Sequence, residues 1–93
     1  MTFLNEAFKA LSDPTRRKIL HMLKEKELCA GEISDAFDMS KPSVTHHLNI
    51  LTQSGLILRE KKGQNVYYSL NTTVFQDVIQ WFFNFKKRGD KNE

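Results

Sequence analysis

The sequence predicts a mainly α-helical domain with one small β-hairpin, in the order α-α-α-α-β-β-α. Three observations predict it. Apolar residues recur three and four positions apart in five segments, which is the spacing of one buried helix face. Two short runs rich in Val, Tyr and Leu flank the turn-forming segment 62–65 (KGQN), as in a hairpin. Pro14 and Gly55 stand where one helix should begin and another should end.

The length and composition indicate one domain that associates with a second copy. We expect residues 1–88 to form the domain and residues 89–93 to form a flexible tail. A chain of this size buries only about 60–65% of its unfolded surface. Yet 40% of the residues are hydrophobic and 11% are aromatic, and much of this apolar material lies near the two ends. We therefore expect a dimer.

The first two helices are predicted from their apolar faces and from the boundary between them. The first face is made of Phe3, Leu4, Ala7, Phe8 and Leu11. Asp13 can cap the free N–H groups of the second helix, and Pro14 at its first position loses no hydrogen bond. The second helix has a buried stripe of Ile19, Leu20 and Leu23. Its basic side chains should then face mostly outward: Arg16, Arg17 and Lys18.

Two helices joined by a tight turn occupy the middle of the chain, and a charged ribbon follows them. The third helix is expected at residues 29–37, on an apolar repeat of Ile33, Ala36 and Phe37. The fourth is expected at residues 41–53, with Ser40 as its N-cap and a buried stripe of Val44, Leu48 and Leu51. Strands are expected at 56–59 and 66–70. This order is a helix-turn-helix followed by a β-ribbon, or wing, and it is typical of proteins that read DNA.

The last helix, expected at 74–87, is apolar around more than half of its circumference. Such a helix must be buried on more than one side, and the second side is most simply another subunit. The alternative is a helix threaded through the core of a monomer. The side chains predicted to form the dimer interface are Phe3, Leu4, Phe8, Phe75, Val78, Ile79, Trp81, Phe82 and Phe85.

The outward face of the fourth helix and the tip of the ribbon are the predicted DNA-binding surface. The helix residues are Lys41, Pro42, Ser43, Thr45, His46 and Asn49. The ribbon residues are Lys61, Lys62 and Gln64. Short polar groups near a helix N-terminus suit base edges and phosphates. The net charge of +3 is modest, so its placement says more than its size, and a third basic cluster occupies 86–88. The alternative is an ordinary solvated surface.

Neither a metal centre nor an active site is predicted. Adjacent helical residues point about 100° apart, so His46 and His47 cannot easily share one ion. We expect His47 to be a packing histidine with a hydrogen-bond partner. Cys29 is the one cysteine, and we expect a small, half-buried residue near a helix cap, with mild thiol reactivity as the alternative. Glycine-rich phosphate loops, spaced carboxylate pairs and nucleophile elbows are missing, so neither an enzyme nor a cofactor is expected.

The chain has neither a signal-peptide pattern at its start nor an apolar run of the roughly 20 residues that span a bilayer. Together with a single cysteine, this predicts a cytoplasmic protein.

Three segments, 13–20 (DPTRRKIL), 40–51 (SKPSVTHHLNIL) and 61–70 (KKGQNVYYSL), together resemble the ArsR family of bacterial winged-helix repressors. The resemblance covers nearly the whole chain. Residues 71–74 (NTTV) and 80–81 (QW) are similar to the SdpR-type autorepressors of that family. The family implies a homodimer built from the first and last helices, a recognition helix at 41–53 and a wing at about 58–70. It also implies double-stranded operators that are imperfect inverted repeats.

The departures from the family bear on regulation. Metal-sensing members resemble ELCVC in the third-helix region, where this chain has ELCAG at 27–31 and so lacks the second thiolate. Other sensors place histidines along the last helix, where this chain has Asp77 but no histidine. Direct metal sensing and a small-molecule ligand are therefore not expected. SdpR-type resemblance instead implies sequestration by a membrane immunity-type protein. The rival interpretations are a ligand- or metal-gated sensor and a protein-interaction module on the same fold.

Overall fold

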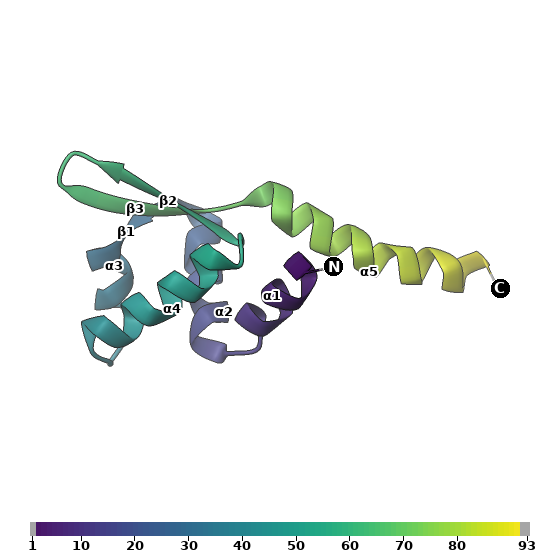
Figure 1. Cartoon of the computed structure of the whole chain (residues 1–93), viewed down its shortest axis with the longest axis horizontal. Helices are drawn as coiled ribbons and strands as arrows, with labels where there is room; N and C mark the ends of the chain where they lie inside the picture. The colour runs from purple at the N-terminus through teal and green to yellow at the C-terminus, as the bar shows by residue number, and fades with distance from the viewer. Residues whose placement is uncertain (1, 92–93) are drawn as a thin grey trace.

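The computed structural model describes the backbone of residues 2–91 and the side chains of residues 4–85. The elements follow in the order α1 (Thr2–Leu11), α2 (Pro14–Glu25), β1 (Leu28–Cys29), α3 (Ala30–Asp35), α4 (Lys41–Gln53), β2 (Ile57–Lys62), β3 (Asn65–Leu70) and α5 (Thr72–Lys91). Helices α2, α3 and α4 lie beneath a small sheet, and α1 lies beneath the first part of α5 (Figure 1). The hairpin of β2 and β3 projects from one end of the molecule and α5 from the other (Figure 1).

The predicted order is confirmed, with one added strand. The backbone of Leu28 pairs with Tyr68 and that of Cys29 with Tyr67, so β1 extends the hairpin to an antiparallel sheet of order β1-β3-β2. We expected a helix at 29–37, but α3 begins at Ala30 and ends at Asp35. Cys29 is its N-cap and Ala36 its C-cap, which leaves Ala36 exposed, not buried as expected. A strand of two residues leaves no periodicity, so the pattern could not reveal it.

The core lies where α1, α2, α3, α4 and the start of the hairpin meet. Its largest fully buried side chains are Ile19, Ile33, Val44, Leu48, Leu51, Leu56 and Ile57. The predicted buried stripes of the second and fourth helices are confirmed by this set together with Leu20 and Leu23. Helix α4 begins at Lys41 and ends at Gln53, as expected, and its apolar stripe docks it against the rest of the domain.

Two glycines set the ends of the hairpin. Gly55 follows the C-cap of α4 with a φ of 84°, the left-handed conformation expected for this position. Gly63 has a φ of 63°, and Gln64 beside it has a negative φ, as in the two-residue type II′ turn. This turn joins Lys62 directly to its cross-strand partner Asn65. Any other residue would be strained at either of these positions.

The corner between α1 and α2 differs from the expectation in one respect. Asp13 caps α2 as predicted, accepting a hydrogen bond of 3.1 Å from the Arg16 backbone N–H, and Pro14 is the first helical residue. The Arg16 side chain, however, is buried, with 9% of the residue exposed, whereas we expected it to face outward. It turns back to bind carbonyl groups at the end of α1, so its charge is not available at the surface.

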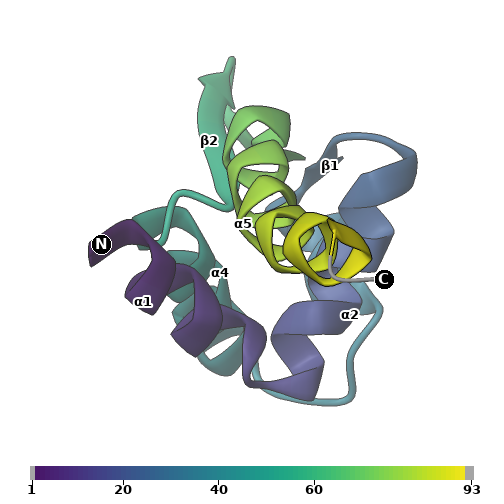
Figure 2. The ribbon, with the colours of Figure 1, turned by 90° about the vertical axis from the view of Figure 1, so that its right-hand side faces the viewer.

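Helix α5 is longer than the predicted 74–87, since it starts at Thr72 and extends to Lys91. It lies against α1, where the Phe8 ring meets Trp81 and Phe82 at centroid distances of 5.5 and 6.0 Å. Beyond α1 the helix continues alone, and Figure 2 looks along it from its free end. None of the described helices is long and apolar enough to cross a membrane.

Candidate nucleic-acid interface

Helix α4 begins at an exposed N-terminal end that Ser40 caps. Its N-cap Ser40 accepts a 3.2 Å hydrogen bond from the Ser43 N–H and donates one of 2.8 Å to the Ser43 hydroxyl. The first turn contains no acidic residue. The helix dipole and the exposed Lys41 side chain therefore give this end of the helix a positive character, which favours an anion such as a phosphate.

The polar face of α4 is exposed along its length. All six helix residues predicted to meet DNA are exposed: Lys41, Pro42, Ser43, Thr45, His46 and Asn49. Lys41 and Thr45 also line a shallow cleft of about 230 Å³ against α3, opposite Ala30, Gly31 and Ser34. The small residues of α3 therefore leave the reading side of α4 open instead of covering it. A helix with one docked stripe and one bare polar face can enter a major groove.

The hairpin places its polar residues at its tip, on the same end of the molecule as the start of α4 and away from α5 (Figure 1). Lys61 pairs with Val66 and Lys62 with Asn65, next to the Gly63-Gln64 turn. All three ribbon residues predicted to meet DNA are exposed: Lys61, Lys62 and Gln64.

Lys62 is not a free cation, because it pairs with carboxylates that the sequence analysis did not identify. Its Nζ lies 2.6 Å from Oε1 of Glu27, in the loop between α2 and β1, and 3.8 Å from Oε1 of Glu60. The same ammonium lies 5.3 Å from the centre of the Tyr67 ring. The hydrogen bond to Glu27 is the main cause of the raised pKa of Lys62. Lys61, with no such partner among the described contacts, is the more available of the two.

Arg59 is a further candidate that the sequence analysis did not name. It is exposed on β2 two residues before Lys61, so both side chains project from the same face of the strand. The alternation of the strand was the signal that could have identified it. Its cross-strand partner Tyr68 is buried, which places Arg59 nearer the body of the domain than Lys61.

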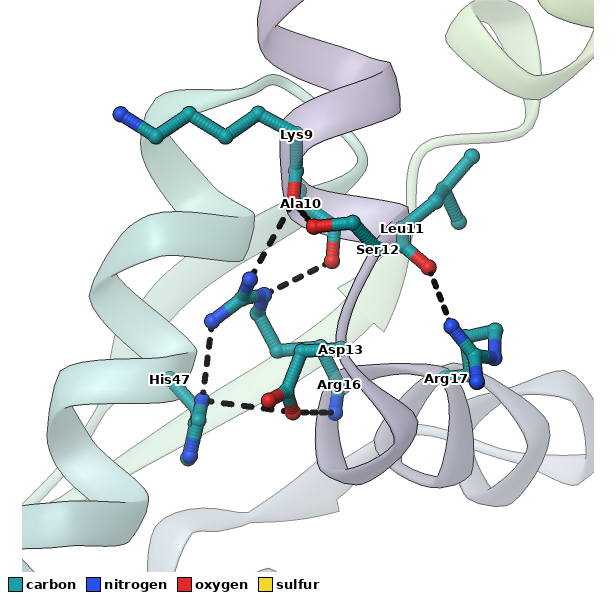
Figure 3. A network of polar contacts seen from close by, with 8 residues as sticks. All are labelled: Lys9, Ala10, Leu11, Ser12, Asp13, Arg16, Arg17 and His47. Atoms are coloured by element: carbon teal, nitrogen blue, oxygen red, sulfur yellow. Dashed lines mark hydrogen bonds and ion pairs between the residues drawn. The ribbon is translucent and has the colours of Figure 1, made fainter.

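Close behind α4, a polar network joins three helices (Figure 3). The Arg16 guanidinium donates through Nε to the carbonyl oxygen of Ala10 at 2.7 Å and through Nη2 to that of Lys9 at 3.2 Å. Its Nη1 lies 3.1 Å from Nδ1 of His47 on α4. The expectation of a partly buried His47 with a hydrogen-bond partner is confirmed. Arg17, exposed, donates to the Leu11 carbonyl oxygen at 2.7 Å.

Asp13 lies at the edge of this network, with Oδ2 3.8 Å from His47 Nδ1. Burial alone would raise the pKa of the Asp13 carboxyl. The hydrogen bond from the Arg16 N–H, together with the nearby His47 and Arg16 side chains, outweighs this and lowers the pKa below its ordinary value of 3.8. The carboxylate is therefore stabilised in its charged form.

The residues predicted to form the dimer interface divide into two groups where their side chains are described. Leu4 and Val78 are buried within the single chain, and Phe8, Phe75 and Trp81 are partly buried there. Ile79, Phe82 and Phe85 remain 48%, 54% and 61% exposed. Phe83, which the prediction omitted, is 52% exposed. Phe3 lies outside the described side chains, as does the basic cluster 86–88.

Cys29 is half-buried at the start of α3, as expected. Its backbone N–H donates to Glu32 Oε1 at 2.9 Å, and this hydrogen bond is the main cause of the lowered pKa of Glu32. Within the described part of the chain, no three His, Cys, Asp or Glu side chains are grouped as metal ligands would be.

Comparison with known proteins identifies the fold and the family. Residues 13–58 match the family described as "Bacterial regulatory protein, arsR family". The chain is 56% identical to the transcriptional repressor SdpR of Bacillus subtilis (strain 168) over 89 residues, which are 96% of this chain and 99% of that protein.

Solved structures agree. The crystal structure of an ArsR family transcriptional regulator has a TM-score of 0.89 and 32% identity, covering 95% of this chain and 97% of that one. A solution structure from Mycobacterium bovis, described as a homodimeric winged helix-turn-helix DNA-binding domain, has a TM-score of 0.72 and 24% identity, covering 98% and 82%. The chain therefore belongs to the arsR family of bacterial regulators, with the winged helix-turn-helix fold and the DNA-binding role in transcription that this membership carries.

Proposed function

We propose that this chain is a homodimeric transcriptional repressor that binds an inverted-repeat operator near its own promoter. The observation that carries the proposal is the bare polar face of α4, with all six outward side chains exposed on a helix whose apolar stripe is fully docked. The repressor relative of 56% identity supports the direction of control.

The homodimer is supported by the apolar surface left on α5. Exposed side chains as large as Phe82, Phe83 and Phe85 are seldom left bare on one helix of a soluble monomer. A second copy packed there would relate two α4 helices by a two-fold axis. Such a pair reads successive major grooves when the helices stand about 34 Å apart. The operator would then be an inverted repeat.

The division of labour follows from the chemistry of each contact. Side chains on α4, with Thr45 and His46 facing the groove floor, would choose the sequence. Lys61 and Lys62 on the wing and the tip of α4 would hold the phosphates and supply affinity without sequence preference. Repression would follow because the bound dimer blocks polymerase at the promoter. Arg16, which was expected to face outward, is not proposed as a phosphate ligand, because its guanidinium is buried against α1.

The test compares the DNA upstream of its own gene with a scrambled duplex of the same composition, using fluorescence anisotropy at several salt concentrations. We expect tighter binding to the upstream region, with the preference retained as salt rises, since phosphate contacts weaken equally on both duplexes. Equal affinity for the two duplexes would reject the proposal. Random-sequence selection with the purified protein would then decide for the protein-interaction alternative if no motif emerged.

Two further questions concern release from DNA. Equilibrium dialysis against zinc, followed by operator binding, separates an ungated repressor from a metal-gated one, and we expect neither uptake of zinc nor a change in operator affinity.

The membrane immunity-type partner is proposed from the SdpR-type resemblance. Reconstituted vesicles that contain the multispanning membrane protein of the same operon should withdraw the repressor from its operator, whereas empty vesicles should not.

A further inference from the structure

The Arg16 guanidinium is a buried permanent charge that connects the helices on either side of it. An arginine cannot lose its proton, and burying it is costly unless its N–H groups are hydrogen-bonded. Three of its nitrogens have partners: two carbonyl oxygens at the end of α1 and Nδ1 of His47 on α4 (Figure 3). Those carbonyls form the partially negative end of α1, which suits a cation. One side chain from α2 therefore ties α1 to α4.

The chemistry of this link defines the state of His47. Arginine has only donors, so the 3.1 Å contact with Nη1 requires an unprotonated Nδ1 that accepts. The proton of a neutral His47 ring must then lie on Nε2. A proton on Nδ1 would leave Nη1 without its acceptor, and a ring protonated on both nitrogens would also place two cations in contact.

A second arrangement is available to a charged His47. Asp13 Oδ2 lies 3.8 Å from Nδ1, close enough that a small shift would let a protonated Nδ1 donate to it. Among the described side chains, the charged or titratable groups beside the His47 ring are Arg16, Asp13 and His46, the last with its exposed ring centred 6.0 Å away. The part of α1 that enters the network consists of backbone carbonyls. His47 can thus pair with Arg16 or with Asp13, according to its charge.

We propose that Arg16 and His47 are positioning residues for DNA recognition. Through these two side chains, α1 is linked to the recognition helix α4. Helix α1 also packs on α5, where Phe8 meets Trp81. The link exists while His47 is neutral and is exchanged for the Asp13 pair when His47 is protonated. Neither side chain touches DNA in this account. The inference rests on the proposed function, because it concerns how the two α4 helices of a dimer are held at the spacing of an operator.

The first experiment measures the link without DNA. Nitrogen-15 NMR of histidine-labelled protein at about pH 7.5 distinguishes the two ring nitrogens, and we expect Nδ1 of His47 to be unprotonated and Nε2 to carry the proton. The Arg16→Lys variant keeps the charge but loses the planar guanidinium with its several N–H donors, and it should remove that tautomer preference. A protonated Nδ1 in the wild-type protein would overturn the proposal.

The second experiment measures the preference for the upstream region over scrambled DNA in three variants. His47→Leu removes the acceptor, and we expect its preference to fall about three- to tenfold, the net effect of one typical hydrogen bond. His47→Asn offers an amide oxygen near the position of Nδ1 and should recover most of the loss. Gln53→Ala, an exposed change at the far end of the same helix, is the matched control and should keep the full preference.

The pH profile separates positioning from simple packing. Histidine side chains change charge between about pH 8 and pH 5. Over that range the preference of the wild-type protein should fall about three- to tenfold relative to His47→Asn, which does not titrate. His46 is present in both proteins, so its contribution cancels in the ratio. Parallel profiles for the two proteins would reject the exchange of partners.

The outcomes also separate this inference from the proposed function. If the wild-type protein itself shows no preference for its upstream region, the proposed function fails, and the NMR measurement still tests the Arg16–His47 link. If the wild type shows the preference and His47→Leu retains it in full while folding normally by circular dichroism, the proposed function stands and the positioning role is rejected.

Discussion

The Nζ of Lys62 lies 2.6 Å from Oε1 of Glu27, so the cation nearest the tip of the wing is held by a carboxylate of its own chain. Both side chains are close to half exposed, at 46% and 44%, and an exposed ion pair of this kind is weak and screened by salt. A DNA phosphate would compete with Glu27 for the same ammonium. The pair therefore sets how much of the Lys62 charge is offered to DNA.

Replacing Glu27 with glutamine should strengthen binding to every DNA sequence alike. The amide keeps the shape of the side chain but not its charge, so Lys62 becomes available to a phosphate. We expect a two- to threefold gain in affinity at low salt, with the salt dependence steeper by up to about one phosphate contact. Titrations of upstream and scrambled duplexes by anisotropy from about 50 to 200 mM salt measure both quantities.

The Lys62→Ala variant is the counterpart. It should weaken binding to both duplexes equally and flatten the salt dependence by about one charge. In the Lys62→Ala background, Glu27→Gln should have little further effect, because the cation that it releases is gone. A salt slope that Lys62→Ala leaves unchanged would remove this side of the wing from the phosphates.

The stability of the domain should depend on pH through Asp13. Its pKa is lowered in the folded protein, so the carboxylate contributes stability above the ordinary value of 3.8, and this contribution is lost as the pH falls through the folded value. Asp13→Asn keeps a good N-cap but no charge. Urea unfolding should find the variant less stable than the wild type at pH 7, with the difference shrinking below about pH 4.

Asp13→Ala removes the cap as well. It should lower the free energy of unfolding by about 1 kcal/mol more than Asp13→Asn does, and this further loss should be nearly independent of pH. Equal stability of the wild type and Asp13→Asn at pH 7 would show that the charge of Asp13 is not coupled to folding.

The sequence predicted the elements with strong local signals. Helix α4 was predicted at its observed bounds because Ser40 caps it and Gly55 ends it, and both signals lie within three residues of the helix. The bare polar face followed from the same pattern, since a stripe of Val44, Leu48 and Leu51 leaves only one side for solvent. Local capping chemistry and helical periodicity together placed every candidate DNA-binding residue of α4 at the surface.

What escaped prediction depends on contacts between distant parts of the chain. The two-residue strand β1 exists because Leu28 pairs with Tyr68, 40 positions later. Arg16 is buried because α1 and α4 lie on either side of it. Its position on α2, outside the apolar stripe of that helix, is typical of a solvated residue. The pairing of Glu27 with Lys62 spans 35 positions. Periodicity reports which face of an element is apolar, but not which charged group another element brings to it.

The choice of DNA sequence should depend on the exposed middle of α4. Thr45→Ala and His46→Ala each remove one side chain that can meet a base edge, and neither side chain has a hydrogen-bond partner among the described contacts. We expect each to cost about 1–3 kcal/mol on the operator and little on random DNA. Competition binding with both duplexes measures the difference. An equal loss on the two would assign these residues to phosphate contact instead of base readout.

The apolar surface of α5 should decide whether the protein dimerises. Trp81 is a poor probe because it packs against Phe8 within the chain, so a charge there would also disturb the α1 contact. Ile79 and Phe83 are better, since 48% and 52% of each is exposed and a substitution would leave the monomer core intact. Phe83→Glu should therefore give a folded monomer, because burying an unpaired carboxylate in the interface is costly.

The matched control for this change is Gln80→Glu, which adds the same charge on the polar side of α5. We expect it to remain dimeric, and size-exclusion light scattering at micromolar concentration reads the mass of each variant. Phe83→Glu should also lose its preference for the upstream region, because a lone α4 contacts only half of an inverted repeat. A dimeric Phe83→Glu protein would move the interface elsewhere on the chain. A monomeric one that kept the full operator preference would show that a single copy suffices for recognition, against the two-fold arrangement proposed for the repressor.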